Sequence, residues 1–111
     1  MADVYSLPLF VSESLVGAST VNREVIPLKN YKLKLGKFAT QLDVAGLGSV
    51  DVTLYLSLND GLSFVASTDL LWQNKDSGSF ISSHTVEAAT HFYVSATSDD
   101  SCDVSLWMTL Q

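Results

Sequence analysis

Two long stretches of the chain alternate apolar and polar residues with a period of two. Successive side chains of a β-strand point to opposite faces, so this pattern predicts two half-buried strands with one apolar face and one mainly polar face. The apolar positions are Val50, Val52, Leu54, Leu56 and Leu58 in the first stretch, and Cys102, Val104, Leu106, Met108 and Leu110 in the second.

Shorter apolar stretches fill the rest of the chain and are separated by turn residues. The turns include Asn59-Asp60-Gly61 and the segment 74–78, and the Asn, Asp and Gly residues in them tolerate a positive φ. Eight or nine short strands at this spacing, with almost no helix, are typical of an all-β antiparallel sandwich. The sequence leaves a jelly roll and an immunoglobulin-like arrangement open.

A length of 111 residues fits a single domain, which we place at residues 12–111. Residues 1–11 are predicted to form an N-terminal arm or an edge strand, because Pro8 has no N–H to donate to a central ladder. As an arm, this segment could add a strand to another chain and place its apolar side chains in pockets there. Those interface candidates are Val4, Leu7, Leu9 and Phe10.

The net charge of −6 is unevenly distributed along the chain. Residues 38–111 hold nine acidic residues against one cation, Lys75, and such a body repels phosphate, which argues against general nucleic-acid binding. The basic segment is either the solvated face of an edge strand or a contact with an acidic partner or neighbouring subunit. It contains Arg23, Lys29, Lys32, Lys34 and Lys37.

No apolar run approaches the roughly 20 residues that span a bilayer, and the first residues show no basic region followed by an apolar stretch. We therefore expect a soluble protein made in the cytosol that does not bind membranes. Cys102 is the one cysteine, which rules out an internal disulfide. Its place in an apolar strand face predicts a small buried hydrophobe and not a reactive thiol.

Candidate catalytic and metal-binding residues are sparse. His84 and His91 are the two histidines, and neither lies near a nucleophile or zinc signature. We therefore expect no enzymatic activity, and we expect both histidine side chains to lie at the surface or the rim of the sandwich. Carboxylates cluster in predicted loops, and such loops form either a calcium site or a solvated acidic surface. The Asp-X-Asn-X-Asp-Gly series of an EF-hand calcium loop is missing, and we expect no cofactor. These carboxylates are Asp60, Asp76, Asp99, Asp100 and Asp103.

Large aromatic residues interrupt the polar faces of the two long strands. Tyr55 shares a face with Thr53, and Trp107 shares one with Ser105. If both strands belong to one sheet, the two rings stand together on its outer surface, where they could lie beneath a loop or the arm, form a protein interface, or stack on a sugar. Trp72, between two turns, could serve either binding role.

The chain resembles the small β-sandwich virion proteins of tailed bacteriophages, in particular capsid decoration or cement proteins. The resemblance extends over the whole chain: an apolar N-terminal segment, an acidic all-β body rich in Ser, Thr, Val and Leu, and the stretch 52–61 followed by a strand. It implies a homo-oligomer, often a trimer, that binds a major capsid protein on the outer surface of a shell. It also implies a virion location after synthesis in the host cytoplasm, and brings no catalytic residues.

The leading hypothesis is therefore a non-enzymatic structural virion protein that binds capsid subunits and itself. The alternative is a carbohydrate-binding module or the receptor-binding head of a phage fibre, which would use Trp107, Tyr55 or Trp72 as stacking rings. A small hydrolase or lyase on a jelly-roll barrel is a third reading, and it requires His84 and His91 to face one cavity.

Overall fold

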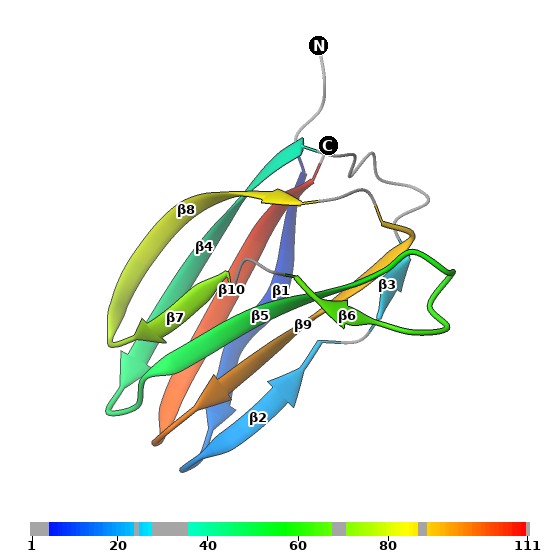
Figure 1. Ribbon diagram of the computed structural model, residues 1–111. Coiled ribbons are helices and arrows are strands. Elements are labelled where there is room, and N and C mark those ends of the chain that lie inside the picture. Colours follow the sequence, from blue (N-terminus) through cyan, green and yellow to red (C-terminus); the bar gives the residue numbers. More distant parts are fainter. Residues whose placement is uncertain (1–4, 24, 28–35, 68–70, 87–88, 111) are drawn as a thin grey trace.

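The computed structural model describes residues 5–23, 25–27, 36–67, 71–86 and 89–110, and in them the chain forms two antiparallel β-sheets packed face to face (Figure 1). Among these residues, no helix is long and apolar enough to cross a membrane. The predicted all-β sandwich is confirmed. The first sheet runs β1 (Tyr5–Leu15), β10 (Cys102–Leu110), β4 (Gly36–Gly46) and β8 (Gly78–Val86).

The second sheet is centred on β9 (His91–Ser98) and β5 (Val50–Ser57), which pair with each other. The short strands β2 (Ser19–Asn22) and β3 (Ile26–Pro27) both pair with β9. On the other side, β6 (Val65–Ala66) and β7 (Trp72–Lys75) both pair with β5. Each sheet is therefore effectively four strands wide.

The pairing order identifies the sandwich as a jelly roll. When β2 and β3 count as one strand, and β6 and β7 as another, the first strand pairs with the last, the second with the second from last, and so on inward to the central pair β5 and β6/β7. This order results when one long antiparallel hairpin folds over on itself, so that its own strands make up the two facing sheets. The structure thus decides between the two arrangements that the sequence left open.

The core lies between the inner faces of the two sheets, where alternate side chains meet. Val52 and Leu54 of β5 and Val104 and Leu106 of β10 have no exposed surface, as period-two alternation predicted. Leu58 departs from the prediction: it lies beyond the end of β5 and is 71% exposed.

From Tyr5 onward, the N-terminal segment forms the edge strand β1. Leu9 and Phe10 are 4% and 5% exposed and belong to the protein's own core. Two consecutive residues can both face inward because the register with β10 shifts between Pro8 and Phe10 and again between Phe10 and Glu13. Leu7 packs against the same core, so these three side chains are not free to enter another chain.

The loops at one end of the sandwich are joined by hydrogen bonds. The backbone N–H of Ser49 donates to Asp99 Oδ1 at 2.7 Å, and the N–H groups of Leu47 and Gly48 both donate to the carbonyl of Ser101 at 3.1 Å. Gly48 lies so close to the next loop that a Cβ there would overlap the Asp100 carbonyl. This close approach requires glycine and fixes the β4–β5 turn against the β9–β10 turn.

Candidate protein-binding surfaces

The two histidines lie in different sheets and have different partners. His84, in β8, has its Nε2 3.0 Å from Thr40 Oγ1, and its ring stands edge-on against Trp72. His91, in β9, has its Nδ1 3.1 Å from Thr90 Oγ1. Both side chains are half-buried, so they take part in the packing of the sandwich rim.

Four of the five acidic loop residues accept hydrogen bonds. In the part of the chain that the structure describes, no group of three or more His, Cys, Asp or Glu side chains could hold a metal ion. Asp60 lies in the β5–β6 loop, at the opposite end from the other four carboxylates. Those four accept hydrogen bonds: Asp99 from the Ser49 N–H, Asp76 from the Ser49 hydroxyl, Asp100 from the Ser101 N–H and Asp103 from the Ser14 hydroxyl.

Trp72 is a core residue, so its expected role as an exposed ring is wrong. It is 7% exposed, and its indole N–H donates to Thr40 Oγ1 at 3.0 Å. A buried Trp needs a partner for this N–H, and Thr40, itself 1% exposed, supplies one inside the core. The ammonium of Lys75 lies 5.6 Å from the Trp72 ring centroid and covers it further.

Tyr55 and Trp107 lie on opposite outer faces of the sandwich, because β5 and β10 belong to different sheets. The two rings therefore cannot form one binding surface. On the Trp107 side, the strand register aligns one row across the sheet, from Pro8 through Trp107 and Gln41 to Ile81. Trp107 is half-buried and Ile81 is 74% exposed.

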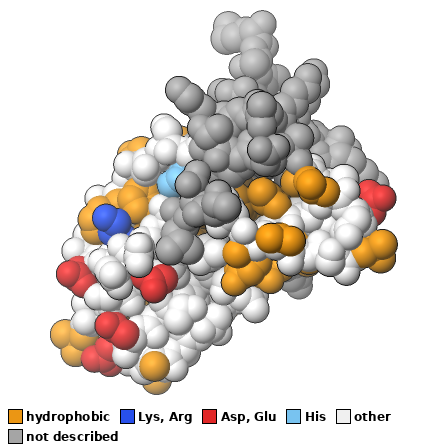
Figure 2. Space-filling model, in the orientation of Figure 1, with side chains coloured by type: hydrophobic (Ala, Val, Ile, Leu, Met, Phe, Trp, Pro, Cys, Tyr) orange, Lys and Arg blue, Asp and Glu red, His pale blue; other side chains and the backbone are white. Residues whose placement is uncertain are grey.

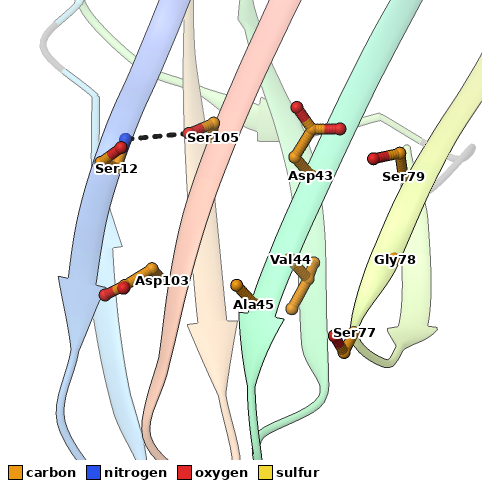
Figure 3. Close-up of a pocket in the computed structure, with 9 residues that line it drawn as sticks. All are labelled: Ser12, Asp43, Val44, Ala45, Ser77, Gly78, Ser79, Asp103 and Ser105. Carbon is orange, nitrogen blue, oxygen red and sulfur yellow. Dashed lines mark hydrogen bonds between the residues drawn. The ribbon is translucent and has the colours of Figure 1, made fainter.

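A shallow depression of about 430 Å³ lies next to this row on the same sheet (Figure 3). Ser12 donates its backbone N–H to Ser105 Oγ across it at 2.9 Å. Asp43 Oδ1 is buried and accepts no hydrogen bond among the described residues. The depression is lined by Ser12, Asp43, Val44, Ala45, Ser77, Gly78, Ser79, Asp103 and Ser105.

The second sheet carries an aromatic cluster on its outer face, made of Tyr55, Tyr93 and Phe64. Tyr55 and Tyr93 are cross-strand partners whose rings stack at 4.6 Å with an interplanar angle of 11°. Phe64 meets Tyr93 edge-on at 5.0 Å. Sequence reasoning missed Tyr93, although the apolar face of Phe92 and Val94 already placed it on the opposite side of β9.

The β5–β6 loop (residues 58–64) borders the aromatic cluster and is held by its own hydrogen bonds. Ser57 Oγ accepts the N–H of Gly61 at 2.9 Å, and Asn59 Oδ1 accepts the N–H of Ser63 at 3.0 Å. The N–H of Asp60 donates to Thr90 Oγ1 at 3.0 Å, which ties the loop to the β8–β9 connection. The predicted turn is confirmed by positive φ at Asp60 and Gly61.

This fixed loop and the strand after it present large apolar side chains to solvent. Leu58 is 71% exposed, Leu62 86% and Val65 71%. Figure 2 shows apolar side chains gathered on this face of the molecule, over β6 and toward the β5–β6 loop. Val65 pairs with Leu56 and therefore faces the other side of β6 from Tyr55 and Ala66. We call Leu58, Leu62 and the aromatic cluster the β6 surface.

The basic segment is described in part. The N–H of Arg23 donates to the carbonyl of Val94 at 2.8 Å, and Arg23 Nε is buried without a hydrogen-bond partner among the described residues. Lys37 lies in β4 opposite Thr85. The remaining interface candidates Val4, Lys29, Lys32 and Lys34 lie outside the described residues.

Comparison with known proteins gives a fold but not a family. No protein-family model and no curated protein matches the chain. Among solved structures, it is similar to a chain from the structure of infectious bursal disease virus, Gx strain, with a TM-score of 0.56 and 11% identity over 97% of this chain. The corresponding chain of the Gt strain gives the same TM-score at 9% identity.

This chain covers 31% of the length of each viral chain. The likeness shows that the jelly roll of this protein also occurs in the structure of a virus. That virus infects animals and is not a phage, so the match shows a shared fold and leaves the phage resemblance a prediction.

Proposed function

We propose that this protein is a non-enzymatic structural virion protein that decorates or cements a phage capsid by binding shell subunits and other copies of itself. The observation that carries the proposal is the β6 surface, where large apolar side chains stand exposed on a loop that its own hydrogen bonds hold in place. The likeness to the infectious bursal disease virus structures supports a particle role.

The energetics of the β6 surface favour a protein partner. Burying a Leu or Val side chain gains about 1.5–3 kcal/mol relative to leaving it in water. Because Leu58 and Leu62 belong to an ordered loop, little conformational entropy is lost when a partner covers them. Contiguous exposed apolar side chains of this kind mark interaction sites on soluble proteins.

A particle-binding assay tests the proposal. The purified protein is mixed with capsids assembled from the shell protein of its own virus, and the fraction that sediments with them is measured. We expect wild type to bind, and Leu58→Ser combined with Leu62→Ser to bind at least about tenfold more weakly. Leu47→Ser is the matched control, because Leu47 is 89% exposed at the opposite end of the sandwich.

Failure of the wild-type protein to sediment with capsids would contradict the proposal. Equal weakening by the loop variant and by Leu47→Ser would show that binding does not depend on the β6 surface. Circular dichroism of all three proteins confirms that the substitutions, each at an exposed site, leave the fold unchanged.

Carbohydrate binding is the second candidate, and the half-buried Tyr55 ring favours it. The Tyr55 ring stacks on Tyr93 on one side, and its cross-strand neighbour on the other side is the small, exposed Ala66. A glycan array of wild type, Tyr55→Ala and Trp107→Ala tests this reading. Saturable glycan binding that either variant abolishes would support carbohydrate binding. If the wild-type protein binds no glycan, this function is excluded.

A further inference from the structure

Three of the four sheet edges are poor templates for pairing with another strand. Edge strands expose unpaired N–H and C=O groups, and proteins protect them with proline, bulges or short length. The β1 edge carries Pro8 and two register shifts. The edges of the second sheet consist of strands of two or four residues, β2 and β3 on one side and β6 and β7 on the other.

The β8 edge has none of these protections. β8 is nine residues long, and its register with β4 is unbroken from the Gly36–Val86 pair to the Val44–Gly78 pair. Its sequence, GSFISSHTV, contains no proline, lysine, arginine, aspartate or glutamate. In Figure 1 it forms the outer margin of its sheet, and no described strand pairs with its far side.

The register shows which backbone groups face the open edge. The N–H of Ala39 donates to Thr109 Oγ1, so Ala39 turns its backbone toward β10 and away from β8. In an antiparallel ladder, hydrogen-bonded and non-hydrogen-bonded pairs alternate, so its partner Ser83 turns its own backbone away from β4. The same holds at every second position. The open-edge residues are Ser79, Ile81, Ser83 and Thr85.

We propose that β8 pairs antiparallel with β8 of a second copy of this chain, about a twofold axis at Ser82, which joins two four-stranded sheets into one. This register opposes Ile81 to Ser83 of the partner and Ser79 to Thr85, so all four open-edge residues form hydrogen-bonded pairs. The inference names a self-association site for the assembling role proposed above and rests on that role.

A second copy fits this edge for two reasons. The chain carries a net charge of −6, which disfavours self-contact over most of its surface. β8 contains no Asp, Glu, Lys or Arg, so two copies meet there without carboxylates, ammonium or guanidinium groups in opposition. The register also places the Ile81 side chains of the two copies diagonally across the new strand pair. Ile81 is 74% exposed in the monomer, and this contact would cover it.

Sedimentation equilibrium of the full chain tests the inference. We expect a mass of twice 12.0 kDa for wild type at high concentration. Ile81→Lys places two ammonium groups at the diagonal contact, and Ser83→Pro removes an N–H that faces the open edge without removing a bond to β4. Each should weaken dimerisation about tenfold or more. Gln41→Lys is the control, since Gln41 is exposed on the same face one strand inward.

A wild-type protein that stays monomeric at every concentration would overturn the inference, as would a dimer that Ile81→Lys and Ser83→Pro leave intact. A dimer that Gln41→Lys disrupts as strongly as Ile81→Lys would place the contact on the sheet face and also overturn it. The particle-binding assay uses different residues, at the β6 surface, so loss of one activity with retention of the other separates the two proposals.

Discussion

Phe10→Ala is predicted to destabilise the protein strongly, because β1 is part of the core. Phe10 is 5% exposed and lies beside Leu9 and opposite Leu106 of β10. Truncating a buried Phe to Ala costs about 3–5 kcal/mol, which combines lost burial with the cavity left behind. For 111 residues each kcal/mol corresponds to about 4 °C, so the melting temperature should fall by about 12–20 °C.

Thermal and urea denaturation, followed by circular dichroism, measure this change. Val11→Ala is the matched control, because Val11 is the next residue in β1 but 64% exposed, and its effect should stay within about 0.5 kcal/mol. If Phe10→Ala costs less than about 1 kcal/mol, or no more than Val11→Ala, then the N-terminal segment is a detachable arm and the assignment of β1 to the core is wrong.

Two further predictions concern the interior. Thr40→Val removes the hydrogen-bond partner of both the Trp72 indole N–H and His84 Nε2, and should lower the free energy of unfolding in urea by about 2–3 kcal/mol. Thr40→Ser keeps the hydroxyl and loses one methyl group, so it should cost about 1 kcal/mol. Equal costs would contradict the role of the hydroxyl. Burial raises the pKa of the Cys102 thiol, and the Asp103 carboxylate raises it further. The native thiol should therefore react with Ellman's reagent far more slowly than the thiol of the urea-unfolded chain, and equal reaction rates would contradict its burial. Because the folded state holds the thiol proton to higher pH than the unfolded state, the free energy of unfolding should fall as the pH rises through the alkaline range.

Local patterns in the sequence predict the strands and turns well, because each depends on neighbouring residues alone. Alternation correctly assigned the buried faces of β5 and β10, and the φ values of Asp60 and Gly61 match the turn chemistry of Asn-Asp-Gly. The N-terminal strand was harder to predict. Leu9 and Phe10 are adjacent and both buried, and this requires shifts in register that no periodic pattern reveals.

The candidate surfaces depend on which strands share a sheet, which the sequence does not determine. Alternation places Tyr55 and Trp107 on polar faces, but the jelly-roll order puts β5 and β10 in different sheets, so the rings are separated by the whole sandwich. The burial of Trp72 depends on Thr40, 32 residues away, which supplies its hydrogen-bond partner. Tyr93 and Phe64 join Tyr55 only once β9 and β6 flank β5.

The most direct test of the proposed function, that this protein binds a viral shell, is quantitative mass spectrometry of gradient-purified particles of the virus that, under this proposal, encodes it. The account predicts that the chain is present in a fixed molar ratio to the major shell protein, unchanged through repeated purification. Absence of the chain from intact particles, or a ratio that falls with each gradient, would contradict the account.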